Sequence, residues 1–489
     1  MFIGRKAVLL CHISSCRFQT MKRNILSYLT VACLVALTAF TSCGEDRSGE
    51  YYALISSKTW MYQTMQDYYL FYQDLPAESE LDFFMTPEQF LNAAASEKDK
   101  KNGVLYSHID SVKTTSTTRT LSESPTYGYE AVMLQAENGD YALQVLYIQP
   151  DSPAEEAGLK RGDLIIGADS IKIGSNDYGK YVSSPTTAHK FTLGTYNAEL
   201  AKMDTTGTVQ MPAPRIVEIQ NLLKTSLISS GNRTAAYILY NEFGEEDATQ
   251  WQSLYSQLAS THPDDIILDL RYNPGGYVST AQLVATLFAP STALGQPMLY
   301  MTPNDKIATV ESYNFDASLL PGGSSLTYRN LYILTSGNTA SASEIVINCL
   351  RPYLTGNLYQ VGTATFGKNV AQARYTDEQA PLLELWLTTY YLSNAEGYQD
   401  YDAEGLQPDF TLSESYGSAL GELGSADDLL MQPVLVHMAT GAFPSSETPT
   451  ATRISKAIPA SMRIIHHSID DKPHRTRTDR HPAVLPSSN

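Results

Sequence analysis

TSGNTASASEIVINCLRPYLTGNLYQVGTATFGKNVAQ, residues 335–372, is the stretch that decides the fold. Its turn of small residues, TASASE, runs directly into an apolar segment that is typical of a buried helix. A strand-like run, LYQVG, comes next, followed by a glycine turn that carries Lys368. The strand-like NLYILTS leads into the same turn, so strand, helix and strand alternate. This alternation predicts an α/β fold with a mainly parallel sheet, whose sites gather at the carboxyl ends of the strands.

Ser341 lies in the TASASE turn, where the following helix would present free N–H groups and the positive end of its dipole. Such donors suit a developing oxyanion, and a serine there can be a nucleophile if a base lies within reach. Lys368 is the candidate base. Burial in an apolar pocket can lower a lysine pKa from about 10.4 by up to about 3–5 units. Phe366 and Val370 are consistent with such a pocket, and Gln372 could hold the amine without adding charge.

Two other interpretations use the same residues. TASASE could simply cap a helix while Lys368 is a solvated loop charge. A different serine hydrolase could instead use a histidine base. The candidate histidines are His108, His189, His262 and His437. None of them lies in a glycine-rich or strand-end motif.

TASASEIV followed by TATFGKNVAQ resembles the active site of the C-terminal-processing, or tail-specific, serine peptidases. The resemblance implies that Ser341 is the nucleophile, that Lys368 is the general base and that Gln372 assists the lysine. Ser343 and Glu344 also match the family's pattern, and we interpret them as structural.

The glycine turn DLRYNPGG, residues 269–276, is a second match to these peptidases. In the family, the oxyanion hole uses a glycine N–H of this turn together with the N–H that follows the nucleophile. The resemblance implies that the oxyanion hole here consists of the N–H of Ala342 and the N–H of either Gly275 or Gly276. The sequence alone does not decide between the two glycines. The alternative is an ordinary tight turn.

Composition narrows the possible partners. The chain has 489 residues, with 52 acidic and 34 basic side chains and a net charge of −18, which argues against nucleic acid as a partner. The mature protein would keep at most two of the five cysteines, Cys43 and Cys349. This argues against a disulfide framework and a cysteine-based zinc site. We expect no metal and no cofactor.

The amino end resembles an export signal. From Met21, two basic residues precede an apolar core of about a dozen residues, which is shorter than the roughly 20 that span a membrane. FTSC followed by Gly44 resembles a bacterial lipoprotein processing site, which would make Cys43 the lipidated first residue. Residues 1–43 are thus interpreted as an upstream extension plus a signal peptide. A signal without lipidation is the alternative.

Two regions precede the α/β part. Residues 51–115 show apolar residues at helical spacing, with Thr86 predicted as a helix cap, and resemble the small amino-terminal domain of tail-specific peptidases in Bacteroidetes. Residues 116–215 contain SPAEEAGLKRGDLIIGADSI, which resembles a PDZ domain. That resemblance implies a groove that adds a peptide as a strand. It also implies a loop that holds the peptide's terminal carboxylate, here Tyr127, Gly128 and Tyr129. A small β-domain without a ligand is the alternative.

The remaining boundaries follow from composition and pattern. A linker is predicted around residues 210–230, and the α/β part covers residues 231–440. Within it, LLELWLTTYYLSNAEG is interpreted as a hairpin. Residues 441–489 are rich in Ser, Thr, Pro, His and Arg without periodicity, which predicts a disordered tail.

Together the motifs predict an α/β multi-domain protein with a helical N-terminal domain, a PDZ-like domain and a peptidase core. The expected function is a serine endopeptidase with a Ser–Lys dyad that recognises protein or peptide substrates by their free C-terminal ends. We expect it in the bacterial cell envelope, anchored to the membrane by a lipid. The alternative function is a catalytically inactive, peptide-binding lipoprotein scaffold.

Overall fold

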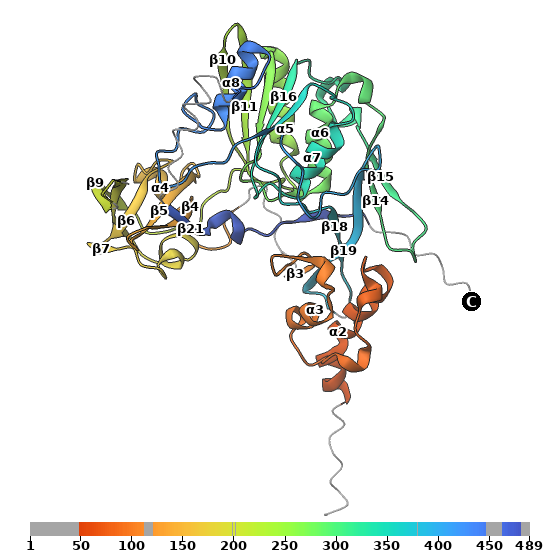
Figure 1. The fold of residues 1–489 in the computed structure, drawn as a ribbon. Coiled ribbons are helices and arrows are strands. Elements are labelled where there is room, and N and C mark those ends of the chain that lie inside the picture. Colours follow the sequence, from red (N-terminus) through yellow and green to blue (C-terminus); the bar gives the residue numbers. More distant parts are fainter. Residues whose placement is uncertain are drawn as a thin grey trace, which may run out of the picture. The chain divides into compact units, whose positions relative to one another are not determined.

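The computed structural model describes most of the chain from Ser48 onward (Figure 1). From Trp60, the described residues form one compact unit. Cys43 and the predicted signal peptide lie outside the described residues, and no described helix has both the length and the hydropathy of a membrane-spanning segment. The described residues are 48–111, 121–197, 199–200, 202–378, 380–445 and 462–480.

The N-terminal region is helical, as its pattern predicts. Its helices are α2 (Ser48–Tyr68) and α3 (Pro87–Ala94). Thr86 accepts a hydrogen bond from the Gln89 N–H at the start of α3, and proline at the first helical position needs no N–H partner. The region also contributes a strand, β3 (His108–Ser111), to a sheet of the core. It is therefore built into the core rather than being an independent helical module.

A six-stranded sheet forms the centre of the core, in the order β10-β11-β12-β16-β17-β20. All its pairings are parallel except that of β10 with β11, which confirms the mainly parallel sheet. The strands are β10 (Leu222–Ser230), β11 (Arg233–Tyr240), β12 (Asp265–Asp269), β16 (Asn330–Thr335), β17 (Leu358–Gly362) and β20 (Phe410–Thr411).

Both faces of this sheet are buried. Successive side chains of a strand point to opposite faces, and in this sheet they belong to two different apolar clusters. In β11, Ile238 belongs to the apolar cluster that also contains residues of α5 (Ala248–Thr261), α6 (Val278–Phe288) and α7 (Ala342–Leu350). Its neighbours Tyr237 and Leu239 belong to a second cluster, with residues of α8 (Met431–Thr440). This double burial explains the nearly continuous apolar runs in the sequence.

The linker prediction around residues 210–230 was wrong in its second half, where β10 forms. Gly231 and Asn232 make the two-residue turn of a hairpin between β10 and β11. β10 is an edge strand in which the exposed residues Thr225, Leu227 and Ser229 alternate with half-buried ones, the period of two that is typical of a strand with one side facing solvent.

A second sheet has the order β13-β22-β18-β19-β14-β15, with β3 also paired to β19. β19 is one strand of twelve residues rather than the hairpin predicted there, because it has partners along both edges. The other strands are β13 (Gly276–Tyr277), β14 (Pro297–Thr302), β15 (Glu311–Asn314), β18 (Val370–Tyr375), β19 (Leu383–Asn394) and β22 (Thr476–Thr478).

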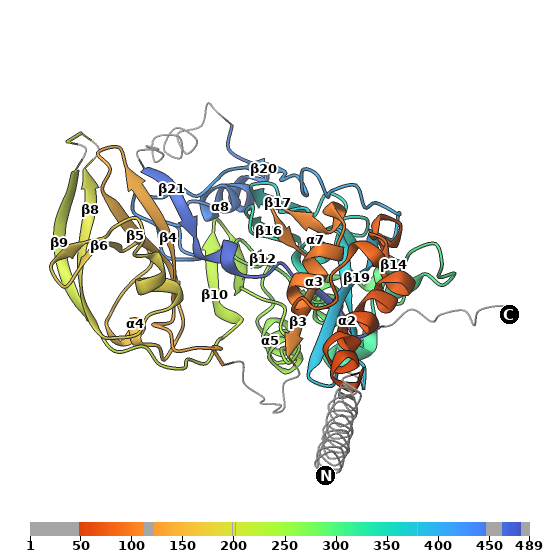
Figure 2. The ribbon, with the colours of Figure 1, turned by 90° about the horizontal axis from the view of Figure 1, so that it is seen from below.

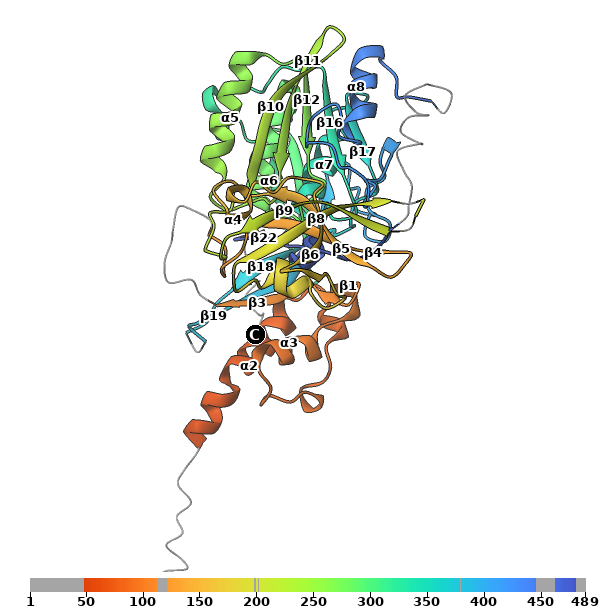
Figure 3. The ribbon, with the colours of Figure 1, turned by 90° about the vertical axis from the view of Figure 1, so that its left-hand side faces the viewer.

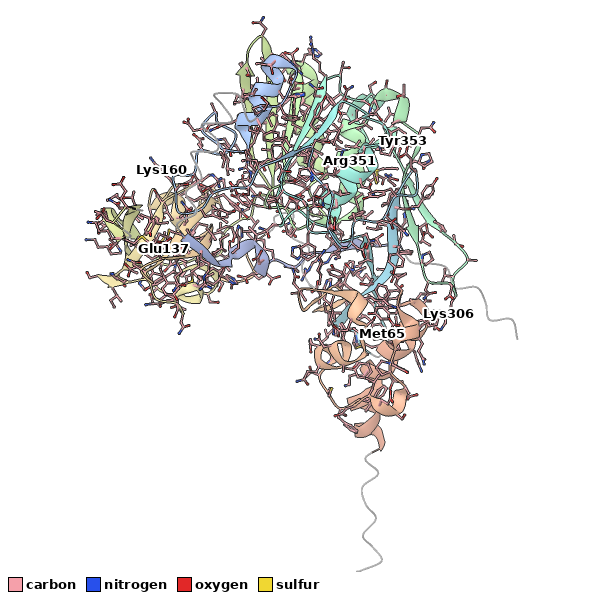
Figure 4. All side chains as sticks on the ribbon, viewed as in Figure 1. Met65, Glu137, Lys160, Lys306, Arg351 and Tyr353 are labelled. Atoms are coloured by element: carbon pink, nitrogen blue, oxygen red, sulfur yellow. The ribbon has the colours of Figure 1, made fainter. Side chains whose placement is uncertain are left out.

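The PDZ-like region forms a third sheet, in the order β21-β4-β5-β6-β8-β9, with β7 paired to β6. Figure 4 shows its side chains near the labelled Glu137 and Lys160, those of the N-terminal helices near Met65, and those beyond the end of α7 at Arg351 and Tyr353. The elements are β4 (Tyr129–Ala136), β5 (Tyr141–Ile148), α4 (Pro153–Glu156), β6 (Leu164–Ala168), β7 (Ile171–Lys172), a single-turn π-helix η4 (Gly179–Ser183), β8 (His189–Asn197) and β9 (Lys202–Met211).

The prediction of a disordered tail was wrong for residues 462–480. They form β21 (Met462–His467), the 3-10 turn η8 (Ser468–Asp471) and β22, joining the PDZ-like sheet to the second core sheet. The dark blue segment in Figures 1 and 2 follows this path, and Figure 3 labels β22 beside β18. The segment lacks a periodic pattern because each of its short strands depends on the edge of a sheet that other parts of the chain build.

Candidate active site

Ser341 occupies the tight turn between β16 and α7. Its backbone has φ 61° and ψ −115°, a conformation that is costly for a residue with a Cβ and that proteins retain mainly at functional sites. The Ser341 N–H donates to Glu344 Oε2 at 2.6 Å. Ala342 follows as the first residue of α7, so its N–H is one of those that no carbonyl of the helix accepts.

Lys368 is fully buried, in the turn before β18. Its Nζ donates to Gln372 Oε1 at 2.7 Å and lies 4.7 Å from the centre of the Tyr106 ring. Burial lowers the pKa of Lys368 well below its usual value, whereas the negative charges of Asp99 and Glu344 act in the opposite direction. The amine thus has the environment that a neutral, basic lysine needs.

Glu344 connects the serine turn to the lysine turn. Beyond the Ser341 N–H, its carboxylate accepts the N–H of Lys368 at 2.8 Å, the N–H of Gly367 at 2.7 Å and the hydroxyl of Thr365 at 2.6 Å. Burial raises the pKa of Glu344, and these four donors oppose that effect by stabilising the charged form. Glu344 therefore has the structural role that the sequence suggested, fixing the two turns against each other.

Asp99 stands behind the lysine at the end of a hydrogen-bond chain. Gln372 Nε2 donates to Thr388 Oγ1 at 2.9 Å, and Thr388 Oγ1 donates to Asp99 Oδ1 at 2.5 Å. Tyr69 and Ser107 also donate to this carboxylate, and burial raises the pKa of Asp99 to about 6. Sequence reasoning missed Asp99, since an acidic residue after a short helix carries no signal of burial.

The DLRYNPGG turn lies beside Ser341. The Gly275 N–H donates to the side chain of Asn273 at 2.9 Å, whereas the Gly276 N–H points to the carbonyl of Arg475 at 2.7 Å. A Cβ on Gly275 would lie 2.6 Å from the Ser341 side chain, and one on Gly276 would lie 2.1 Å from the Phe243 carbonyl oxygen. Both positions therefore require glycine, and only Gly276 directs its N–H toward a carbonyl at the site.

The tail segment occupies this site. The Ser341 hydroxyl donates to the Arg475 carbonyl at 2.5 Å and is hydrogen bonded to the Thr476 hydroxyl. Lys368 Nζ donates to the His474 carbonyl at 2.5 Å. Between the two described side chains of Ser341 and Lys368 themselves there is no hydrogen bond. The structure thus brings together Ser341, Lys368, Gln372, Ala342 and the glycine turn, with the tail between the serine and the lysine.

The other candidate residues lie elsewhere. No side chain of a described histidine hydrogen bonds to Ser341. Cys349 is a buried residue of α7. In the PDZ-like region, the Gly128 N–H donates to the Thr126 hydroxyl at 3.1 Å, and the side chains of Tyr127 and Tyr129 are buried, with Tyr129 donating to the Tyr181 carbonyl at 2.6 Å.

Three regions of the sequence match known families, one for each part of the fold. Residues 234–412 match peptidase family S41, and residues 56–108 match the N-terminal domain of S41 peptidases. The core of the chain is thus a peptidase S41 domain. Residues 144–189 match the PDZ domain, so the resemblance found in the sequence is confirmed for both the peptidase core and the PDZ domain.

The proteins to which this chain is similar include named proteases. A carboxyl-terminal-processing protease of Picosynechococcus sp. is 28% identical over 297 residues, which cover 60% of this chain and 66% of that protein. The carboxy-terminal processing protease CtpB of Bacillus subtilis is 24% identical over 330 residues, 66% of this chain and 62% of that protein. The crystal structure of a Bacteroides fragilis protein, described as a candidate S41 protease, superposes with a TM-score of 0.68 at 27% identity, covering 78% of this chain and 97% of that one.

Proposed function

We propose that this protein is a serine endopeptidase that uses Ser341 as nucleophile and Lys368 as general base. The observation that carries the proposal is the buried Lys368 amine, which Gln372 orients by an uncharged hydrogen bond beside the Ser341 turn. A neutral lysine amine can accept a serine proton once the two groups are in hydrogen-bond reach, which a charged lysine in water cannot do near neutral pH.

In the proposed mechanism, Ser341 Oγ attacks the carbonyl carbon of the substrate while Lys368 takes its proton. The N–H groups of Gly276 and Ala342 stabilise the oxyanion. The C–N bond then breaks, and Lys368 returns the proton to the leaving amine. Water hydrolyses the resulting ester at Ser341, with Lys368 again acting as the base, which restores the free serine and releases a new C-terminal carboxylate.

The substrates we propose are exported or envelope proteins, recognised by their free C-terminal ends through the PDZ domain. The loop at Tyr127, Gly128 and Tyr129 would hold the terminal carboxylate, and the edge of β4 would add the peptide as a strand. We further propose that Cys43 is lipidated, which would anchor the enzyme in the bacterial cell envelope. The names of the relatives, which are C-terminal-processing proteases, support the proposed recognition of C-terminal ends.

A cleavage assay tests the proposal. The chain from Gly44 onward, as wild type and as Ser341→Ala, is given an unfolded protein with either a free or an amidated C-terminus, and products are identified by mass spectrometry. We expect cleavage by the wild type only, and slower cleavage of the amidated protein. Equal cleavage of both proteins would remove the carboxylate-selecting role of the PDZ domain. Binding of the free-ended protein without any cleavage would favour the inactive scaffold instead.

A further inference from the structure

The segment of residues 462–480 follows the path on which a substrate peptide would lie. Its first part, β21, extends the PDZ sheet antiparallel to β4, from Met462 opposite Ala136 to His467 opposite Val132. The Ala131 N–H then donates to the Ser468 hydroxyl at 3.1 Å, so the segment advances toward the loop that ends at Tyr129. This is the strand addition by which sheet edges bind extended peptides.

The second part, β22, fills a position between two strands of the core. It is parallel to β13 on one side, with Thr476 opposite Gly276, and to β18 on the other, with Arg477 opposite Gln372. The side chains of Thr476 and Thr478 are buried. β22 thus lies between β13, which begins in the glycine turn, and β18, which follows the lysine turn. A peptide substrate would occupy the same position.

The main chain of this segment engages the proposed nucleophile, the proposed general base and the Gly276 N–H of the proposed oxyanion hole. The Arg475 carbonyl accepts from the Gly276 N–H and from the Ser341 hydroxyl, and the His474 carbonyl accepts from Lys368 Nζ. Both the serine hydroxyl and the lysine amine therefore donate to the segment and not to each other. In this arrangement the amine is not placed to take the serine proton, so the peptide bond after Arg475 is held without being attacked.

Basic side chains hold the segment in place. Arg475 and Arg477 both pair with Asp110, and the Arg477 guanidinium lies 4.7 Å from the centre of the Trp386 ring. Lys472 Nζ lies 2.9 Å from Glu130 Oε1 and donates to the Tyr147 hydroxyl at 2.8 Å. Acidic and aromatic residues thus line the path on both sides of Ser341, which suits a basic extended peptide.

We propose that residues 462–480 are an internal pseudosubstrate, which blocks the PDZ edge and the catalytic serine until it is displaced by an extended basic peptide. This inference rests on the proposed peptidase function. It identifies the occupant as a segment of the same chain, held in the substrate's position and left uncut. As long as it is tethered, the segment acts at the high effective concentration of an intramolecular ligand.

Cutting the tether tests this inference directly. A recognition sequence for a site-specific protease is placed between Ser445 and Met462, and activity on an unfolded protein is measured before cutting and after cutting and dilution. We expect kcat/KM to rise about tenfold or more on cutting, and a synthetic peptide of residues 462–480 to inhibit competitively when added back. Unchanged activity after the segment has left, shown by native mass spectrometry, would overturn the inference.

The same experiment separates this inference from the proposed function. If the cut and diluted enzyme shows no cleavage at all, the peptidase proposal fails; if cut and uncut enzymes are equally active, only the pseudosubstrate fails. The intact mass of the uncut chain is also followed over time. Self-cleavage between Arg475 and Thr476, absent in Ser341→Ala, would make the segment a substrate and would also overturn the inference.

A charge reversal provides an independent test in the full chain. Arg477→Glu places a negative charge against Asp110, and we expect activity to rise about tenfold. Arg463→Glu is the matched control, because Arg463 is an exposed residue of the same segment whose guanidinium donates to Gln135 of the PDZ sheet, away from Asp110, and we expect little change. The triple variant Asp110→Arg/Arg475→Asp/Arg477→Asp reverses every charge of the cluster, so it restores opposite-charge pairs at both positions and is expected to return to low activity. Equal activity of all four proteins would contradict the proposal.

Discussion

Ser341 combines a proposed chemical role with a conformational cost. Its φ of 61° and ψ of −115° fall where glycine is favoured and where other residues incur roughly 1–3 kcal/mol of strain. The hydrogen bond from its N–H to Glu344 and the packing of the turn against Gly275 keep the residue in place. The fold thus uses stability gained elsewhere to hold a serine at the amino end of α7.

Comparing two inactive variants measures this strain. Ser341→Gly removes both the hydroxyl and the Cβ, whereas Ser341→Ala removes only the hydroxyl. We expect the glycine variant to be more stable than the alanine variant by about 1 kcal/mol, because glycine adopts this backbone without steric cost. Denaturant unfolding of the two proteins measures the difference, and an alanine variant of equal or greater stability would show that the turn stores no strain.

The pH dependence of cleavage reports on Lys368. Only the neutral amine is a base, so kcat/KM should rise as the pH increases through the lowered pKa of Lys368 and then level off. The carboxylate of Asp99 raises the pKa of Lys368, so Asp99→Asn should move this limb to lower pH. Gln372→Glu adds a negative charge beside the amine and should move the limb to higher pH.

Asp74→Asn serves as the control for these shifts. Asp74 pairs with Ser96 and Lys98 near the surface, in the same N-terminal region as Asp99, and does not contribute to the pKa of Lys368. Its pH profile should match that of the wild type. Profiles that move in the same direction in Asp99→Asn and Gln372→Glu would contradict a lysine base.

At the scale of elements, the turns around the site could be predicted from the sequence because their residues have strong local preferences. The Thr86 cap, the small residues before α7 and the glycines before α6 each match one conformation. Asp99 and Asp110 could not be predicted as part of the site. Their positions depend on β3 and the residues before it packing against β19, a contact between segments far apart in the sequence.

The tail illustrates the same limit. β21 has no regular alternation of exposed and buried residues, and β22 has only three residues. Both form only because β4, β13 and β18 offer edges. A segment that becomes ordered only by pairing with other strands needs no apolar pattern of its own, so its sequence resembles that of a disordered tail. The sequence therefore predicted the residues that meet at the candidate site but not the segment that covers them.

The buried isoleucine of the tail provides a prediction at this scale. Ile469 is fully buried against the second face of the core, whereas Ile464 in the same segment is 49% exposed. Ile469→Ala removes apolar contacts worth about 2–5 kcal/mol of docking energy, so the segment should undock more readily and peptidase activity should increase. Ile464→Ala should leave activity unchanged. Equal activity of both variants would indicate that docking of η8 does not control access to Ser341.

At the scale of the molecule, a basic segment docks on a protein whose net charge is −18. Ion pairs with Asp110 and Glu130 are partly exposed to solvent, so salt should screen them. With a substrate that has no charged residues near the cleavage site, the activity of the full chain should rise several-fold between low and high salt. The enzyme with the cut tether should show no such rise, and a parallel increase in both would assign the salt effect to the substrate.

Residues 462–480 pair with both the PDZ sheet and the second core sheet. The peptidase proposal itself depends on one residue, an activated Ser341. Labelling with a fluorophosphonate, which reacts with activated serines, tests that proposal most directly. The enzyme with the cut tether and its Lys368→Met variant, which keeps an unbranched side chain in the pocket without the amine, are treated in parallel, and adducts are located by mass spectrometry. The account predicts one adduct, on Ser341, whose rate of formation rises with pH and falls at least about 100-fold in Lys368→Met. Equally fast labelling of both proteins, or an adduct on another residue, would contradict it.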